Sequence, residues 1–304
     1  MKEDGKTQVR DSARGCIIAG AIGDAMGIPF EGSRGPLQFY PHKDWAISDD
    51  TQLTLATCES IIEIGEVSPK HIADRFVQWF RARRITGMGA STLKALRDLD
   101  AGQHWALAGA KGERTAGNGA AMRIAPLAFH LNPLNTNDRQ IIRDVCRITH
   151  HNEESYVGAL VVTIAVRALA AGQSTPSELL QIVSENIPDS RVKDRIRELI
   201  NLEDDPGIAA VGSRFGSSGY VVESVPLALW AATHLNRLPL QELLVKVIEI
   251  GSDTDTVASM TGQMAGARLG ASQISRDLIK SLPNAGEIER LADEFAATLQ
   301  SAAA

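Results

Sequence analysis

The sequence is poor in aromatic side chains and in cysteine. Phe, Trp and Tyr make up 5% of the 304 residues, and the three cysteines, Cys16, Cys58 and Cys146, lie far apart in apolar stretches. Cysteines at this spacing match neither a metal-binding nor a redox motif. We interpret them as small core residues of a protein from a reducing compartment, which excludes a disulfide-stapled scaffold.

Long hydrophobic runs and clustered positive charge are also missing. No apolar run approaches the ~20 residues that a membrane span needs, and residues 1–14 are polar and charged, unlike a signal peptide. The net charge is −6 and the pI is about 5.7, with no basic stripe that would neutralise a phosphate backbone. We therefore expect a cytoplasmic protein with no membrane partner, and the charge argues against nucleic acid as a main partner.

What the sequence does contain is helical periodicity, because Ala, Leu, Ile and Val recur at three- and four-residue spacing with almost no strand-like alternation. At 44% hydrophobic residues the chain can bury a substantial core, and no linker divides it. We predict a compact all-α single domain over residues 11–300, with 1–10 and the Ala-rich end 301–304 flexible. The expected helices cover residues 15–27, 51–64, 68–83, 138–149, 154–171, 176–186, 190–201, 221–234, 239–249, 255–268 and 285–300.

Turn-forming residues mark the boundaries between these helices. Ser68-Pro69 and Thr175-Pro176 each place a capping residue before a proline at the first helical position. Dense glycine predicts loops where the backbone turns sharply or approaches a ligand closely. These loops are expected at residues 23–48, 84–91, 109–120 and 212–220.

Two acidic clusters at opposite ends of the chain are the most informative motif. They read SDDT at 48–51 and DTDT at 253–256, and each stands at the start of a helix-like apolar run. Their carboxylates should therefore gather at helix N-termini. Asp and Thr oxygens are hard ligands that suit Mg²⁺, Mn²⁺ or Ca²⁺ better than Zn²⁺ or copper. Four aspartates from two segments could hold two such ions.

Helix capping is the competing explanation for these clusters. Ser48 and Asp253 stand where a side chain accepts hydrogen bonds from the free N–H groups of a helix start. For either cluster alone we favour capping. Together the clusters exceed what capping needs, since each carries two carboxylates that repel one another unless a cation neutralises them. We therefore interpret them as halves of one metal site.

Four further segments carry polar groups with more than one reading. Asp24 lies in a helix of small residues, and we favour a buried structural hydrogen bond or salt bridge over a catalytic role. Residues 117–123 end a Gly-rich loop and open a helix, whose N-terminus would suit phosphate, although Gly-Asn-Gly is also common in turns. The His pair in 149–152 could contact a ligand or lie at the surface. Residues 215–220 could stack on a planar base or form an ordinary loop.

Taken together, six stretches resemble the ADP-ribosylglycohydrolase family, which includes the dinitrogenase-reductase-activating glycohydrolases. They are GCIIAGAIGDAMGIPFEG (15–32), SDDTQLTLA (48–56), GNGAAMR (117–123), ITHH (148–151), ESVPLAL (223–229) and GSDTDTVASMTGQMAGA (251–267). They follow the family's order and span about residues 14–270. The combination of SDDT, a late DTDT and a central GNGAAMR is far more specific than any one piece.

The resemblance implies an all-α fold with two divalent cations, Mg²⁺ or Mn²⁺. The implied activity is hydrolysis of the N- or O-glycosidic bond that joins ADP-ribose to an acceptor, as in an ADP-ribosylated protein. Matched position by position, the metal ligands are Ser48, Asp49, Asp50, Asp253, Asp255 and Thr256. The matched ADP-ribose contacts are Thr115, Asn118, Gly119 and His150, with Gly216, Ser217, Gly219 and Tyr220 beside the adenosine end. Asn118 and Gly119 lie in the stretch that matches the ribose and diphosphate site, and His150 matches a histidine near the diphosphate.

The resemblance also implies a carboxylate that transfers protons beside the metals. Glu31 matches a glutamate that caps the metal site in the serine-directed branch of the family. Asp49, Asp50 and Asp255 are the other catalytic candidates. A metal-bound carboxylate is a poorer base because the cation lowers its pKa, so Glu31 is our first choice.

One stretch departs from the family pattern. The dinitrogenase-reductase branch places an aspartate before a Val-Gly-Asn segment near its proposed base, whereas residues 84–89 here read RITGMG. Arginine and serine linkages therefore both stay open as the acceptor. The alternatives are a hydrolase of a different ADP-ribose conjugate, on a small molecule or nucleic acid, and a non-catalytic, crystallin-like binding protein. We expect a monomer.

Overall fold

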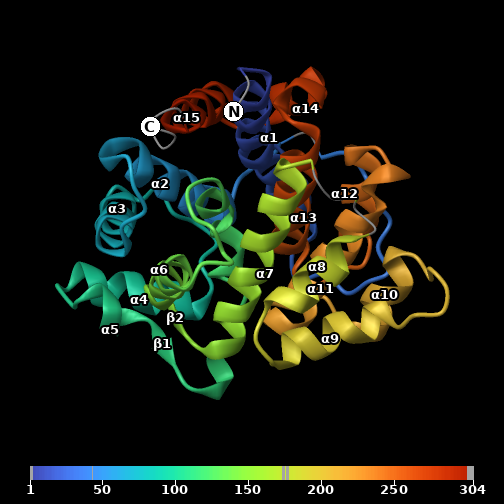
Figure 1. The fold of residues 1–304 in the computed structure, drawn as a ribbon, viewed down its shortest axis with the longest axis horizontal. Helices are drawn as coiled ribbons and strands as arrows, with labels where there is room; N and C mark the ends of the chain where they lie inside the picture. The colour runs from blue at the N-terminus through green and yellow to red at the C-terminus, as the bar shows by residue number, and fades with distance from the viewer. Residues whose placement is uncertain (1–2, 43, 173–174, 176–177, 300–304) are drawn as a thin grey trace.

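Two helices from opposite ends of the chain lie side by side at the centre of the molecule (Figure 1). The computed structural model describes residues 3–42, 44–172, 175 and 178–299. Helix α1 (Glu3–Gly27) packs along α13 (Thr254–Leu269), and α7 (Glu153–Ala170) and α11 (Val221–Ala232) pack against α13 in turn. These helices supply much of the buried apolar core.

Small residues explain why α1 and α13 come so close. A Cβ atom at Gly23 would lie 2.1 Å from the carbonyl oxygen of Ala258, and one at Gly266 would lie 2.0 Å from that of Gly15. A side chain at either position would overlap the backbone of the other helix. Because Gly15 faces Gly266 while Gly27 faces Asp255, the two helices run antiparallel.

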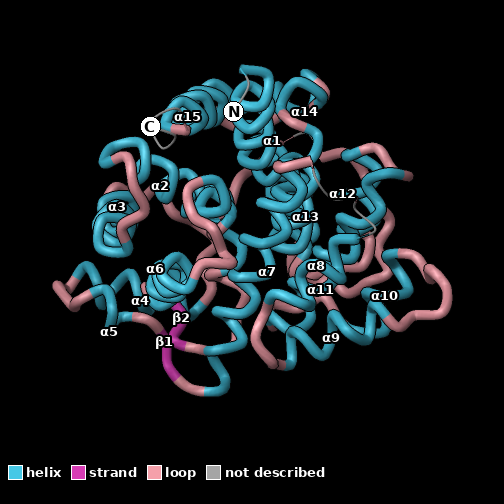
Figure 2. The backbone as a smooth tube through the Cα atoms, in the orientation of Figure 1, coloured by secondary structure: helices cyan, strands magenta, loops and turns pink. Residues whose placement is uncertain are grey.

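The remaining elements surround this pair. The helices are α2 (Asp49–Ile64), α3 (Pro69–Arg81), α4 (Ala90–Asp100), α5 (Trp105–Ala108), α6 (Thr136–Arg147), α8 (Leu179–Asn186), α9 (Arg191–Ile200), α10 (Ile208–Phe215), α12 (Leu240–Ile248), α14 (Arg276–Ser281) and α15 (Ala285–Thr298). Strands β1 (Ala110–Lys111) and β2 (His150–His151) pair in parallel, and Figure 2 shows them toward one edge of a largely helical backbone. The prediction of an all-α fold is confirmed.

Some boundaries differ from those expected. Helix α1 begins at Glu3, whereas we expected this helix to begin near residue 15. Residues 23–27, which were assigned to both an expected helix and an expected loop, end α1, as the helix expectation has it. The loop prediction was wrong for residues 212–215, which end α10. Gly212 reflects close packing rather than a turn, since a Cβ atom there would lie 2.6 Å from Ile250 Cδ1. The cap expected at Pro176 and the chain end at 301–304 lie outside the described residues.

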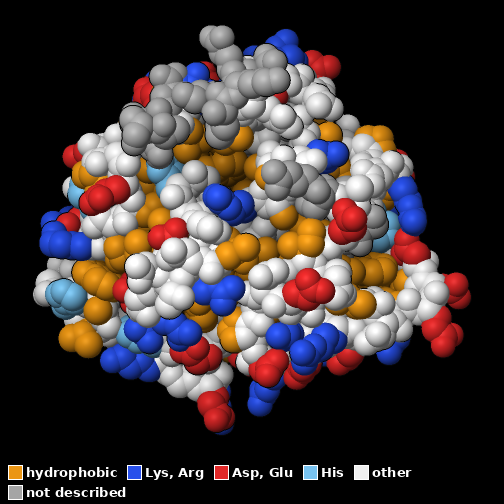
Figure 3. Space-filling view, viewed as in Figure 1, with side chains coloured by type: hydrophobic (Ala, Val, Ile, Leu, Met, Phe, Trp, Pro, Cys, Tyr) orange, Lys and Arg blue, Asp and Glu red, His pale blue; other side chains and the backbone are white. Residues whose placement is uncertain are grey.

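The exposed surface is mixed in charge. On the face shown in Figure 3, Lys and Arg side chains are interspersed with Asp and Glu, as a sequence without a basic stripe predicts. Cys16, Cys58 and Cys146 are free and buried, which confirms their interpretation as core residues. Within the described part of the chain, no helix has both the length and the apolar character to cross a bilayer.

Candidate metal centre and ligand site

The first acidic cluster lies at the N-terminus of α2, as the sequence predicts. Ser48 is the N-cap residue and its hydroxyl accepts a hydrogen bond from the backbone N–H of Asp50 at 3.2 Å. The same hydroxyl lies 2.8 Å from Asp24 Oδ1 and 2.9 Å from Asp50 Oδ2, so its single proton is shared between two carboxylates. Capping therefore accounts for Ser48 but leaves the carboxylates of Asp49 and Asp50 free for another role.

The second cluster lies at the N-terminus of α13, and there capping fails as an explanation. Asp253 occupies the N-cap position, yet its side chain accepts no hydrogen bond from the backbone of the helix start. Its Oδ2 atom instead accepts a hydrogen bond of 2.6 Å from Asn118 Nδ2. Thr256 donates its hydroxyl proton to Asp50 Oδ2 at 3.2 Å, which joins the two clusters directly.

Helix α1 contributes a carboxylate that the sequence did not assign to the cluster. Asp24 is fully buried and accepts hydrogen bonds from the backbone N–H and hydroxyl groups of both Ser48 and Thr51. This confirms the structural hydrogen bonding that we favoured for Asp24. One carboxylate oxygen each of Asp24, Asp50 and Asp255 nevertheless lies within 4.8 Å of the others. The only signal in the sequence was an acidic residue in a helix of small side chains.

The electrostatics of this cluster favour a bound cation. Burial, followed by the charge of Asp255, raises the pKa of Asp50 well above its usual range. Burial and Asp253 raise the pKa of Asp255 to about 9, and burial and Asp24 raise that of Asp49 to about 7. Packed carboxylates without a counter-ion must take up protons, so a cation would replace those protons.

Two oxygen atoms in the cluster test whether a cation fits. Asp50 Oδ1 and Asp255 Oδ1 are buried and have no hydrogen-bond partner among the described residues. A buried acceptor without a partner is costly, and a metal ion would satisfy both oxygens. The surrounding donors are carboxylate and hydroxyl oxygens, which is the set that Mg²⁺, Mn²⁺ and Ca²⁺ prefer. The residues present therefore fit a divalent metal ion.

Glu31 lies at the edge of this cluster. It directly follows the short 3₁₀ helix η1 (Ile28–Phe30), and the next residue, Gly32, donates its N–H to Ser252 O at 2.8 Å. Partial burial and the charge of Asp253 raise the pKa of Glu31. Its side chain is exposed and makes no hydrogen bond within the described ranges. Glu31 is thus a free carboxylate within electrostatic reach of the metal candidates.

The loop that departs from the family pattern borders the same cluster. A Cβ atom on Gly87 would lie 3.3 Å from Ser48 Cβ and 3.7 Å from Asp49 Oδ1. The Gln52 side chain holds this loop, since its Oε1 accepts the Thr86 N–H at 2.7 Å and its Nε2 donates to Ile47 O at 2.9 Å. Residues 84–89 therefore present backbone, and no carboxylate, beside Asp49.

The predicted ligand loops meet next to Asp253. The Asn118 N–H donates to Gly219 O at 3.1 Å, and Gly117 and Tyr220 form an antiparallel bridge. A Cβ atom on Gly219 would lie 3.7 Å from Asp253 Oδ2. Two loops that are about 100 residues apart in sequence thus line one wall beside the acidic cluster with glycine backbone.

Residues 117–123 open a helix as expected, but it is only η3 (Ala121–Arg123), a 3₁₀ helix of three residues. So short a helix has too few aligned peptide units to concentrate positive potential at its start. Anion binding at a helix N-terminus therefore does not explain this loop.

Several predicted ligand contacts have their polar groups engaged within the protein. The hydroxyl of Thr115 donates to Gly112 O at 2.7 Å, and that of Ser217 donates to Gly251 O at 3.0 Å. Gly216 has a φ of 91°, and a Cβ atom there would lie 2.4 Å from the carboxylate of Glu223. Thr115, Ser217 and Gly216 therefore stabilise the conformations of their own loops through these contacts. The Tyr220 hydroxyl accepts a hydrogen bond from Arg191 at 3.4 Å.

His150 and Gly119 are in contact at this loop. His150 is buried, and a Cβ atom on Gly119 would lie 2.8 Å from its Cε1 atom. Burial, together with the charge of Arg123, lowers the pKa of His150 to about 3. The two histidines therefore differ in exposure, because His150 is buried whereas His151 is half-buried and lies nearer the surface.

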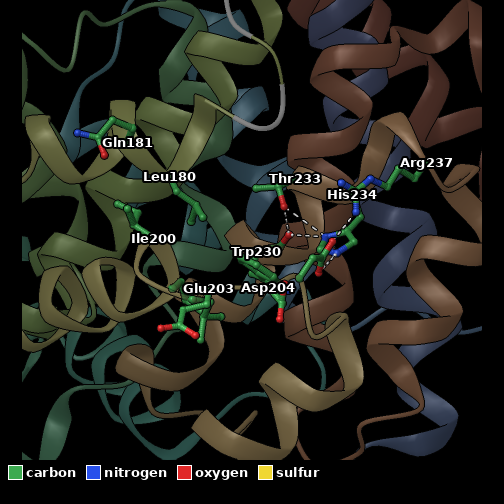
Figure 4. A pocket seen from close by; sticks show the side chains of 12 residues that line it. Leu180, Gln181, Ile200, Glu203, Asp204, Trp230, Thr233, His234 and Arg237 are labelled. Carbon is green, nitrogen blue, oxygen red and sulfur yellow. Dashed lines mark hydrogen bonds and ion pairs between the residues drawn. The ribbon is translucent and has the colours of Figure 1, made fainter.

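A separate cavity of about 320 Å³ lies between α8, α9 and the end of α11 (Figure 4). Leu180 and Ile200 line it opposite Trp230, Thr233 and His234. No residue of the acidic clusters or of the predicted ligand loops lines this cavity. It is therefore distinct from the site described above.

Comparison with known proteins agrees with the resemblance over nearly the whole chain. The family model described as ADP-ribosylglycohydrolase matches residues 5–304. ADP-ribosylhydrolase ARH3 of Gallus gallus is 25% identical over 93% of this chain and 92% of its own length, and ADP-ribosylarginine hydrolase Tri1 of Serratia proteamaculans is 26% identical over 94% and 79%. A solved structure titled ADP-ribosylglycohydrolase-related protein complex aligns with a TM-score of 0.75 at 25% identity, covering 96% of this chain and 99% of that one.

Proposed function

The chain belongs to the ADP-ribosylglycohydrolase family, and on this premise we propose that it hydrolyses the glycosidic bond between ADP-ribose and an acceptor. The proposal rests on two buried oxygens, Asp50 Oδ1 and Asp255 Oδ1, which have no hydrogen-bond partner in the described part of the chain and come from helix starts at opposite ends of the sequence. The names of the relatives, an ADP-ribosylhydrolase and an ADP-ribosylarginine hydrolase, support the same reaction class.

The residues that would hold two divalent cations, Mg²⁺ or Mn²⁺, are Ser48, Asp49, Asp50, Asp253, Asp255 and Thr256. Bound cations would supply Lewis-acid polarisation of water and of the ribose hydroxyls. Asp24 has a different role, since four donors already occupy its oxygens and it holds the start of α2 in place. Asn118 holds Asp253 in the same way through a 2.6 Å hydrogen bond.

Glu31 is the carboxylate best suited to move protons. Its raised pKa and its lack of a hydrogen-bond partner among the described residues leave it able to accept a proton. In the proposed reaction, Glu31 takes a proton from the attacking water as the bond from the anomeric carbon to the acceptor breaks. It then returns that proton to the nitrogen or oxygen of the leaving acceptor.

The reaction class is tested by release of ADP-ribose from arginine- and serine-linked ADP-ribosylated peptides, with Mg²⁺ or Mn²⁺ and with EDTA. We expect ADP-ribose to be released from one of the two linkages and EDTA to abolish this release. Asp255→Asn should lower the release at least ~100-fold, since the variant loses a ligand of the metal that would polarise the water. Asp189→Asn is the matched control, because Asp189 lies on the exposed surface. Release that survives EDTA would contradict the metal proposal.

The role of Glu31 is tested separately. Glu31→Gln should lower turnover ~100-fold or more, the usual size of a lost general base, while metal content and stability stay at the level of the unmodified protein. Glu66→Gln changes another exposed glutamate and should leave turnover unchanged. Equal turnover in both variants would assign the proton transfer to a group other than Glu31.

The acceptor is decided by the same peptides. Residues 84–89 lie against Asp49 without a carboxylate, so no acidic side chain of this loop is available to pair with a guanidinium. This favours an acceptor other than arginine. Faster release from the serine-linked peptide is the expected result, and preferential release from the arginine-linked peptide would reverse the assignment.

A further inference from the structure

Three side chains form an unbroken buried chain behind the Gly117–Gly119 loop. Arg123 and Thr149 have no exposed surface, and His150 is 3% exposed. One guanidinium nitrogen of Arg123 donates to Thr149 Oγ1 at 2.8 Å, and Thr149 Oγ1 lies 2.9 Å from His150 Nδ1. A fully buried arginine is rare in proteins, which points to a specific use for this one.

Donor counting assigns the direction of these hydrogen bonds. A guanidinium only donates, so Thr149 Oγ1 must be the acceptor toward Arg123. The hydroxyl has one proton, and within the described residues its one remaining hydrogen-bond neighbour is His150 Nδ1. If Nδ1 carried a proton, the Thr149 proton would be left buried without an acceptor, which is costly. The network is satisfied when Nδ1 accepts and the ring proton sits on Nε2.

The Nε2 edge of the ring faces the glycine loop. A Cβ atom on Gly117 would lie 3.1 Å from His150 Nε2, and one on Gly119 would lie 3.4 Å from it. Nε2 has no hydrogen-bond partner among the described residues. It is also not among the side-chain polar atoms that are completely buried without a partner. Its N–H is therefore a donor that remains available beside Gly117 and Gly119.

The neighbouring charge keeps this donor neutral. The pKa of Arg123 falls to about 10 through burial, so its guanidinium still carries a proton at neutral pH. Burial and this positive charge lower the pKa of His150 to about 3. The imidazole therefore donates without gaining a charge of its own, and Arg123 provides positive potential behind it.

We propose that Arg123 and Thr149 are positioning residues that lock His150 in the neutral Nε2–H tautomer, so that Nε2–H donates to an anionic oxygen of the ligand at the glycine wall. Given the proposed function, on which the ligand assignment rests, that oxygen belongs to the diphosphate of ADP-ribose. The glycines at 117 and 119 leave the ring edge uncovered, and a side chain at either position would cover it.

The tautomer is measured first, by ¹⁵N nuclear magnetic resonance of the histidine rings in the ligand-free protein, with His150→Asn used to assign the signal. We expect a protonated Nε2 and an unprotonated Nδ1 for His150 between pH 6 and 8. A protonated Nδ1 would overturn the proposal. This measurement needs neither substrate nor metal, so it does not depend on the proposed function.

Variants of Thr149 test whether its hydroxyl sets the tautomer of His150. Thr149→Val removes the hydroxyl and should lose the tautomer preference and weaken ADP-ribose binding in calorimetry by about tenfold, the size of one hydrogen bond to a charged group. Thr149→Ser keeps the hydroxyl and should restore both. Thr163→Val is the matched control, because the buried Thr163 hydroxyl donates only to Ala159 O at 2.8 Å within α7.

The outcomes separate the two proposals. If the wild-type protein binds ADP-ribose and Thr149→Val binds it with the same affinity, the positioning role of Thr149 is overturned while the hydrolase proposal stays intact. The expected tautomer in a protein that binds no ADP-ribose would overturn the proposed function and with it the ligand of His150. If Thr149→Val does not fold, Thr149→Ser and the wild-type spectrum still decide the tautomer.

Discussion

The two ends of the α1–α13 helix pair differ in what they contribute. At one end Gly15 and Gly266 are buried and let the backbones touch. At the other end the same close approach, at Gly27, brings Asp255 of α13 toward Asp24 of α1. One end gains packing energy, whereas the other gathers carboxylates whose pKa values are raised by burial and, for Asp255, also by the charges of neighbouring carboxylates.

This difference shows how the fold can hold an unfavourable cluster. Close-packed backbone at one end of a rigid helix pair fixes the spacing at the other end, and the apolar burial offsets the repulsion. The carboxylates then stay preorganised for a cation, instead of moving apart. Stability and metal binding should therefore separate between the two ends.

The largest expected effect is at the packed end. Gly266→Ala would place a methyl group 2.0 Å from Gly15 O, and we expect a loss of about 3 kcal/mol in the free energy of unfolding, at the upper end of typical overpacking. Urea denaturation measures it. Gly286→Ala, which places its methyl group in open space on α15, should leave stability equal or slightly higher. An equal loss in both variants would break the comparison.

The acidic end should respond in the opposite way. Asp50→Asn removes a carboxyl group that is costly to bury among other carboxylates, so the metal-free protein should be no less stable than the unmodified protein. Its stabilisation by Mg²⁺, about 2.7 kcal/mol at one hundred times the dissociation constant, should disappear. Thermal unfolding with and without Mg²⁺ measures both quantities, with Asp189→Asn as the surface control. A metal-free variant that unfolds much earlier would assign a structural role to Asp50.

The pH dependence of stability contains a contribution from outside the acidic end. His130 packs on Phe295 and its burial lowers its pKa to about 4. The unfolded chain binds the proton near pH 6.5, so stability is present above pH 6.5 and is lost as pH falls toward 4. Between pH 7 and pH 4, the free energy of unfolding should therefore fall by about 2 kcal/mol less in His130→Gln than in the unmodified protein.

Urea denaturation at several pH values measures this contribution. His42→Gln is the matched control, because His42 is exposed and should leave the slope unchanged. If His130→Gln has the slope of the unmodified protein, the acid sensitivity belongs to other groups.

The smallest effect separates capping from metal binding. Ser48→Ala and Asn135→Ala each remove a side chain that caps a helix, and each should cost about 1 kcal/mol of unfolding free energy. Only Ser48→Ala should also weaken Mg²⁺ binding, because Ser48 contacts the carboxylates of Asp24 and Asp50. Equal Mg²⁺ affinity in the two variants, measured by calorimetry, would reduce Ser48 to a cap.

Much of the fold follows from local patterns. Helical periodicity located α2, α7, α11 and α13 to within a few residues, and the SDDT and DTDT motifs stand at helix starts as expected. The weaker predictions were those based on glycine. Gly212 was read as a loop residue, and Gly23 was placed in both an expected helix and an expected loop, yet each serves close packing inside a helix. A glycine in a sequence does not reveal whether it permits a turn or makes room for a neighbour.

The site was predictable in its ligands but not in its connections. The two acidic motifs and the Gly-Asn-Gly loop were identified as candidates, whereas the hydrogen bond from Asn118 to Asp253 and the contact from Thr256 to Asp50 join residues 135 and 206 positions apart. Asp24 was seen as unusual, but its place among the carboxylates depends on how closely α1 meets α13.

The sequence by itself determined where the helices form, which of them begin with carboxylates, and the family to which the chain belongs. These properties depend on residues within one or two turns of each other or on motifs of a few residues. Only the tertiary structure decided which carboxylates face one another, which hydroxyls are used within loops, and how Arg123 reaches His150 through Thr149. Hydrogen bonds and charge interactions act over a few ångströms, so they are set by the packing that brings distant segments together.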